Sequence, residues 1–108
     1  MKPFVVQTTC SSKKEAKLIS KVLIKSKLAA CIQRTKIKSI YKWDGKVCED
    51  KEYLLTIKTK KQNYKKIQSK IKENHSYDLP EIIGINITNI SREYKNFIKE
   101  NTKWMITF

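Results

Sequence analysis

The chain has 108 residues, a formal net charge of +14 and 40% hydrophobic residues. This length suffices for one domain with its own core and is too short for two, so we expect a single domain over residues 1–108. The start of the chain turns polar too early for a secretory signal, and no later apolar run approaches the length of a membrane span. We therefore expect a soluble protein with no membrane partner.

An apolar run that starts at Phe4 predicts a strand over residues 4–9. Ser12 and Glu15 have the spacing of a capping box, in which each side chain bonds to the other residue's backbone amide, so a helix begins there. Apolar residues at helical spacing form one stripe on this helix and are expected to cover a face of the sheet: Ala16, Leu18, Ile19, Val22 and Leu23.

The longest strand-like stretch covers residues 28–60 and reverses once, at Asp44 and Gly45. An Asp-Gly pair supplies the positive backbone dihedrals of a tight hairpin turn, so the two arms should pair antiparallel. Arms this long do not fit inside a small sheet, and we expect part of the hairpin to project and to be covered by another subunit. Bulges at Lys36 or Asp50, which would divide each arm into two ordinary strands, are the alternative.

The second half of the chain repeats the pattern of the first. Apolar residues at helical spacing predict a helix over residues 62–73, and alternating isoleucines predict a strand over residues 81–89. A polar loop, residues 74–81, joins them. Ser91 is placed to cap a last short helix, and residues 104–106 predict an added edge strand.

The predicted order is strand, helix, strand, strand, helix, strand, followed by the short helix. This is the order of a ferredoxin-like α+β sandwich, whose two main helices cover one face of a four-stranded antiparallel sheet. The other face has no helix of its own, and the hairpin has open edges. Three copies that pack their sheet faces inward would bury both, so we expect a homotrimer.

The basic charge would attract phosphate backbones, which makes a nucleic-acid-binding module the alternative function. However, only Arg34 and Arg92 among the 24 basic residues are arginine, whereas phosphate and base recognition favours the arginine fork. The lysines are scattered along the whole chain, as on an ordinary solvated surface. We therefore expect only non-specific electrostatic binding to nucleic acid.

The three cysteines, Cys10, Cys31 and Cys48, are far apart, odd in number and without a CxxC pair. This spacing predicts neither a disulfide framework nor a zinc ribbon, and it favours a reducing, cytoplasmic location. We interpret Cys31 and Cys48 as small buried hydrophobes in strands, whereas Cys10 is less clearly structural.

Three motifs stand at familiar spacings: KLAACI at residues 27–32, YKWDGK at residues 41–46 and IKT at residues 57–59, together with the loop over residues 75–81. With these motifs, nearly the whole chain resembles the CutA family of divalent-cation tolerance proteins. The resemblance implies a tight homotrimer, association with copper or another divalent metal, a non-catalytic role in metal tolerance, and an architecture like that of PII signalling proteins.

The chain departs from the family pattern at its candidate metal ligands. In the family the loop commonly reads His-Pro-Tyr, often after a second histidine, whereas here Asn74 precedes His75 and Ser76 replaces the proline. Some relatives carry a cysteine at the end of the first strand; the corresponding residue here is Thr8, and Cys10 follows two residues later. His75 and Cys10 are the candidate metal ligands, since thiolate and imidazole suit copper or zinc.

No glycine-rich phosphate loop, nucleophile elbow or pair of histidines is present, so we expect no enzyme. By resemblance, five residues would lie near clefts between subunits, where a small anion or metabolite would bind: Trp43, Glu52, Lys58, Tyr77 and Glu81. A structural ion pair between Lys58 and Glu81 is the alternative interpretation. Residues 101–108 lie outside the resemblance.

Overall fold

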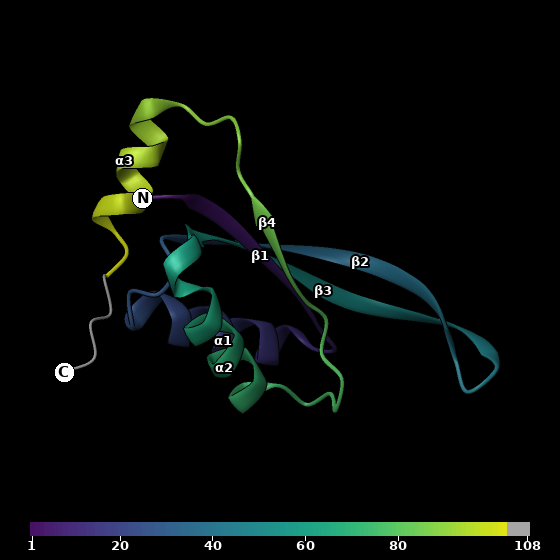
Figure 1. Cartoon of the computed structure of the whole chain (residues 1–108). Helices are drawn as coiled ribbons and strands as arrows, with labels where there is room; N and C mark the ends of the chain where they lie inside the picture. The colour runs from purple at the N-terminus through teal and green to yellow at the C-terminus, as the bar shows by residue number, and fades with distance from the viewer. Residues whose placement is uncertain (104–108) are drawn as a thin grey trace.

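The computed structural model describes residues 1–103, which form an α+β sandwich (Figure 1). The elements follow in the order β1 (Pro3–Cys10), α1 (Lys13–Lys25), β2 (Cys31–Trp43), β3 (Lys46–Lys60), a short 3-10 helix (Lys61–Asn63), α2 (Tyr64–Asn74), β4 (Ile82–Asn86) and α3 (Arg92–Glu100). The strand order in the antiparallel sheet is β2-β3-β1-β4. The predicted ferredoxin-like fold is confirmed, and the predicted edge strand over residues 104–106 lies outside the described residues.

The core lies between the sheet and the pair of helices α1 and α2, which lie together beneath the sheet in Figure 1. Side chains alternate along a strand, so every second residue of β1 and β3 faces these helices. Val6 and Ile57, which are register partners, are both fully buried on this face. On α1, Ala16, Ile19 and Leu23 are buried as predicted, but Leu18 is 49% exposed because it lies to one side of the stripe.

The long hairpin is continuous. Its register runs without interruption from the pair of Cys31 and Lys58 to the pair of Trp43 and Lys46, so the alternative with bulges is wrong. The turn has φ of 51° at Asp44 and 76° at Gly45, which is the geometry predicted for an Asp-Gly pair. Among the described residues, β1 pairs with β3 only as far as Tyr53, and the rest of the hairpin projects beyond the sheet (Figure 1).

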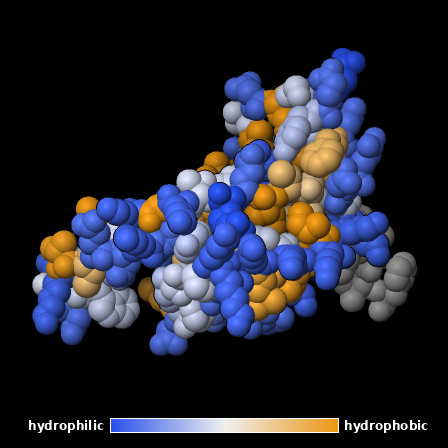
Figure 2. All heavy atoms as spheres, turned by 180° about the vertical axis from the view of Figure 1, so that it is seen from behind, coloured by the Kyte–Doolittle hydropathy of each residue, from blue (hydrophilic) through white to orange (hydrophobic). Residues whose placement is uncertain are grey.

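The sheet face opposite α1 and α2 carries apolar side chains. Ile83 and Ile85 of β4 are 46% and 44% exposed, and Ile85 is the register partner of Val5. Helix α3 covers only one end of the sheet, with Ile98 fully buried. Figure 2 shows hydrophobic side chains in a band across the body of the molecule and in a smaller group at the end of the hairpin, where Ile40 and Val47 are 69% and 79% exposed.

Candidate metal centre

Three elements that are far apart in sequence meet at one end of the sandwich. Cys10 ends β1, Glu15 lies in the first turn of α1, and His75 follows α2 as its C-cap residue. One ligand atom from each residue lies within 4.8 Å of the ligand atoms of the other two. The sequence predicted Cys10 and His75 as partners, and the structure brings them together; Glu15 was not predicted as a member of this site.

Glu15 makes only half of the predicted capping box. Its backbone amide donates to the Ser12 hydroxyl at 3.1 Å, but its carboxylate does not bond back to Ser12. Instead Oε1 accepts a hydrogen bond of 2.8 Å from the backbone amide of Ser76, in the loop after α2. The second oxygen, Oε2, is buried and has no hydrogen-bond partner among the described residues. This orphaned carboxylate oxygen is directed at the cluster.

The imidazole of His75 is completely buried and its two nitrogens have different partners. Nε2 lies 2.7 Å from the backbone carbonyl oxygen of Thr9, and Nδ1 lies 3.1 Å from the backbone amide of Tyr77. A carbonyl only accepts and an amide only donates, so Nε2 carries the proton and Nδ1 holds the lone pair. Nδ1 is also 3.8 Å from Oε2 of Glu15, which makes it the nitrogen on the side of the cluster.

Cys10 is fully buried because it shares the helix-facing side of β1 with Val6 and Thr8. Burial, followed by the negative charges of Glu15 and Glu52, raises the pKa of the Cys10 thiol from 9.0 to about 12. The thiol is therefore neutral near pH 7. A metal ion that binds its sulfur has to displace that proton, since the thiolate is the form that ligates.

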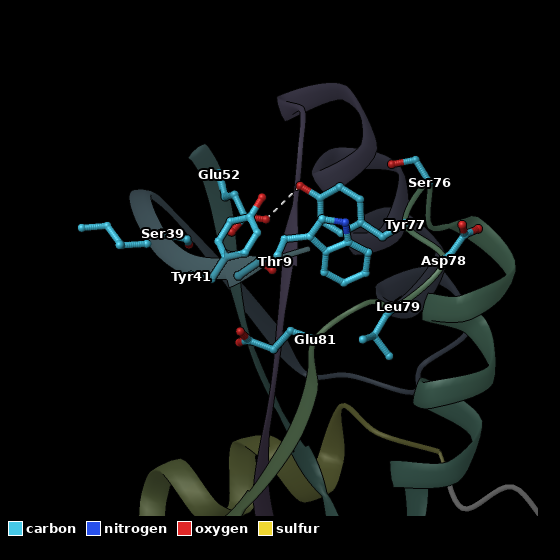
Figure 3. Close-up of a pocket in the computed structure, with 11 residues that line it drawn as sticks. Thr9, Ser39, Tyr41, Glu52, Ser76, Tyr77, Asp78, Leu79 and Glu81 are labelled. Carbon is cyan, nitrogen blue, oxygen red and sulfur yellow. Dashed lines mark hydrogen bonds between the residues drawn. The ribbon is translucent and has the colours of Figure 1, made fainter. Parts of the chain in front are cut away.

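A pocket adjoins the cluster on the other side of the loop. It has a volume of about 760 Å³, and four of the five residues predicted to form a ligand cleft line it: Trp43, Glu52, Tyr77 and Glu81. In Figure 3 the Tyr77 hydroxyl points at Glu52, to which it donates a hydrogen bond of 2.9 Å. Burial, followed by this hydrogen bond, raises the pKa of the Tyr77 hydroxyl above its usual range.

The lining of this pocket is acidic and aromatic. Glu52, Asp78 and Glu81 supply three carboxylates, and Tyr41, Trp43 and Tyr77 supply three rings. Neither lysine nor arginine belongs to the lining among the described residues, although the chain carries 24 basic residues. The predicted small anion therefore has no cationic partner in this pocket.

Lys58 does not line this pocket of the single chain, and its predicted place near a cleft between subunits stays a prediction. It pairs with Val5 and Cys31 in the sheet, and its Nζ lies 5.4 Å from the centre of the Tyr94 ring of α3. The β1–β3 register puts it four residues along β3 from Leu54, the partner of the pocket residue Thr9. No ion pair between Lys58 and Glu81 occurs within residues 1–103. Cys31 and Cys48 are half-buried, so neither is the buried hydrophobe that the sequence predicted.

The fold defines a class, that of small ferredoxin-like α+β proteins with a long hairpin, and in this chain a thiol, a carboxylate and an imidazole lie together at one end of it. Residues 4–101 match the family model described as CutA1 divalent ion tolerance protein. The chain is 39% identical over 99 residues to the divalent-cation tolerance protein CutA of Thermus thermophilus, and the match covers 91% of this chain and 96% of that protein. This chain belongs to the CutA1 family.

Solved structures agree with this assignment. The crystal structure of CutA1 from Oryza sativa superposes with a TM-score of 0.92 at 36% identity and covers 95% of each chain. The structure described as the periplasmic divalent cation tolerance protein CutA from Archaeoglobus fulgidus gives a TM-score of 0.91 at 32% identity, over 94% of this chain and 99% of that one. Within residues 1–103, no helix is long and apolar enough to cross a membrane.

Proposed function

We propose that this chain is a non-catalytic metal-responsive protein that binds one copper or zinc ion at Cys10, Glu15 and His75. The observation that carries the proposal is the cluster itself, in which three donor atoms lie within 4.8 Å of one another. Oε2 of Glu15 is buried without a hydrogen-bond partner, and a buried polar atom in that state is destabilising unless something satisfies it. A cation between the three side chains would do so.

The donor set selects the kind of ion. Thiolate and imidazole are ligands of zinc and copper, whereas magnesium and calcium require mainly oxygen ligands. Donors around a tetrahedral zinc ion are roughly 3.3 to 3.8 Å apart, given metal–ligand distances of about 2.0 to 2.3 Å. Nδ1 of His75 and Oε2 of Glu15 are 3.8 Å apart, and all three donor atoms lie within 4.8 Å of one another, so side-chain rotations would bring them around one ion. Three protein ligands leave a fourth position for water or another ligand.

His75 has the support that a metal-ligating histidine needs. Its Nε2 proton is donated to the carbonyl of Thr9, which fixes the tautomer and leaves Nδ1 for the ion. Glu15 is supported in the same way, because its Oε1 is held by the amide of Ser76 while Oε2 remains available. Asn74, the residue before His75, donates its side-chain amide to the carbonyl of Lys70 in α2.

We further propose that the protein acts as a cytoplasmic homotrimer with the general architecture of PII signalling proteins. The half-exposed apolar residues Ile83 and Ile85 on the open face, and Trp43 on the projecting hairpin, support an apolar interface between copies. The three free cysteines support a reducing compartment.

The adjoining pocket favours a second function, that of a small-ligand sensor. Three aromatic rings and three carboxylates match a small organic cation better than the anion expected from the sequence. The volume of about 760 Å³ lies in the range of ordinary small-molecule sites.

Titration with Zn²⁺, and with Cu(I) under reducing conditions, tests the metal proposal. The wild-type chain should bind one ion per subunit, and Cys10→Ser, Glu15→Gln and His75→Ala should each lose that stoichiometric site. Cys48→Ser and Glu73→Gln are the matched controls, because they remove a half-buried thiol and an exposed carboxylate away from the cluster. If Cys10→Ser binds with the wild-type affinity and stoichiometry, the proposal is wrong.

A further inference from the structure

Nδ1 of His75 accepts a hydrogen bond in the structure and is also the nitrogen that would bind the proposed metal ion. Nδ1 is the ring nitrogen that lies near Glu15, 3.8 Å from Oε2, whereas Nε2 donates its proton to Thr9. The same Nδ1 accepts the backbone amide of Tyr77 at 3.1 Å. The nitrogen has a single lone pair, so it cannot accept this hydrogen bond and ligate a metal ion at the same time.

The amide that would be displaced belongs to a residue of the adjoining pocket. The ring of Tyr77 lies against that of His75, with the ring centres 4.9 Å apart and the planes tilted by 45°, and its hydroxyl donates a hydrogen bond of 2.9 Å to Glu52. Figure 3 shows the Tyr77 side chain reaching from the loop across to the Glu52 carboxylate. Glu52 is 8% exposed, and this hydroxyl is the hydrogen-bond donor that the structure gives it.

We propose that metal binding at His75 Nδ1 and the Tyr77–Glu52 contact are mutually exclusive, so that the ion controls the pocket. This inference rests on the proposed metal site. An ion at Nδ1 releases the Tyr77 amide, the loop shifts at Tyr77, and the hydroxyl leaves Glu52. The carboxylate of Glu52 then faces the pocket as an unpaired anion beside the rings of Tyr41 and Trp43.

The hydrogen bond between the Ser76 amide and Glu15 confines the proposed shift of the loop to Tyr77. Ser76 is held by Oε1 of Glu15, which an ion on Oε2 leaves in place. The loop therefore stays attached at Ser76 while Tyr77, the next residue, changes partner. By thermodynamic linkage, a ligand that takes Glu52 away from Tyr77 must also raise the affinity for the metal ion, by the same factor.

The substitution Tyr77→Phe separates this coupling from the metal site itself. It removes the hydroxyl contact but keeps the backbone amide, the ring and all the carboxylates around Cys10. Tyr41→Phe is the matched control, because Tyr41 lines the same pocket and donates its hydroxyl to Asp50 of β3 but lies outside the loop of His75. The affinity for Zn²⁺ is measured by competition with a chromophoric chelator, and the amide of Tyr77 is followed by ¹⁵N NMR with and without Zn²⁺.

Tyr77→Phe should bind Zn²⁺ more tightly than wild type, by up to roughly tenfold, since one charge-assisted hydrogen bond no longer has to be broken. Tyr41→Phe should bind with the wild-type affinity, and the Tyr77 amide resonance should shift on addition of Zn²⁺. If Tyr77 had only a structural role, Tyr77→Phe would bind Zn²⁺ no more tightly than wild type. If the wild type binds Zn²⁺ but Tyr77→Phe binds it no more tightly than Tyr41→Phe, the proposed coupling between the metal site and the Tyr77–Glu52 contact is wrong, while the metal site itself is supported. If the wild type binds no Zn²⁺, both proposals are wrong.

Discussion

His75 and Thr9 are joined by a hydrogen bond of 2.7 Å between the imidazole Nε2 and the backbone carbonyl, across 66 positions of sequence. This bond connects the loop after α2 to the end of β1, next to Cys10. It also determines which nitrogen could bind a metal ion, because the protonated Nε2 donates to Thr9 and only Nδ1 has a lone pair. The orientation of the His75 ring therefore both joins α2 to β1 and sets the geometry of the candidate metal centre.

Replacing His75 should destabilise the fold as well as remove the metal ligand. His75→Ala deletes a fully buried ring and leaves the Thr9 carbonyl and the Tyr77 amide without their partner, so we expect a loss of roughly 2 to 4 kcal/mol in the free energy of unfolding. Ser76→Ala, in the same loop but with an exposed side chain, should change it by less than about 0.5 kcal/mol. Equal denaturation midpoints for His75→Ala and Ser76→Ala would show that the buried imidazole and its hydrogen bonds do not stabilise the fold.

Metal binding should release a proton from Cys10. The pKa of this thiol is raised to about 12, so the group is protonated throughout the neutral range and must lose its proton to become a ligand. The Kd for Zn²⁺ should therefore fall about tenfold for each unit of rising pH between pH 6 and 8, after correction for the buffer and for zinc hydrolysis. Calorimetry in buffers of different ionisation enthalpy counts the protons; a wild-type count of zero, equal to that of Cys10→Ser, would exclude thiolate ligation.

The same raised pKa predicts how stability depends on alkaline pH. The folded protein keeps the Cys10 proton up to about pH 12, whereas the ordinary pKa of the thiol is 9.0. The folded state therefore binds more protons than the unfolded state between these values, so stability present below pH 9 is lost as the pH rises. Cys10→Ala should lessen the decline by up to about 1.4 kcal/mol per pH unit. Identical alkaline denaturation curves for the two proteins would contradict the burial of this thiol.

Trp43 should matter for assembly and little for the fold of one chain. It is 62% exposed in the single chain and sits at the end of the projecting hairpin, where a neighbouring copy would bury it. Trp43→Ala should then weaken the proposed trimer by on the order of 3 kcal/mol, and far-UV circular dichroism should hardly change. Leu18→Ala, on the outer side of α1, is the control. Sedimentation velocity that shows the same mass distribution for wild type and Trp43→Ala would place Trp43 outside the interface.

Local signals were sufficient to predict most of the fold. The Asp44-Gly45 turn and alternation along both arms predicted the hairpin, and Ser12 and Ser91 cap α1 and α3 as expected. The ends of elements were less certain: β4 covers Ile82–Asn86 and is shorter than the predicted strand. Strand ends depend on which neighbour supplies hydrogen bonds, and β4 pairs with β1 only over five residues.

The candidate site was only partly predictable, for a physical reason. Cys10 ends a strand and His75 follows a helix, and both elements end on the same side of this fold, so the order of the elements was enough to predict that the two residues lie close together. The carboxylate of Glu15 turns away from Ser12 because it meets the amide of Ser76, 61 positions away, and no local pattern reports that contact. Lys58 was assigned to a cleft between subunits by resemblance, and the structure of one chain shows only that it lies outside the pocket that the other four residues line.

The most direct test of the metal centre is anomalous diffraction at the zinc edge from crystals grown with Zn²⁺. We predict one peak per chain, about 2.0 to 2.3 Å from Cys10 Sγ, a carboxylate oxygen of Glu15 and His75 Nδ1. A peak that is bound through Nε2 of His75, or zinc found only at other positions while the Thr9 and Tyr77 hydrogen bonds remain intact, would contradict the account.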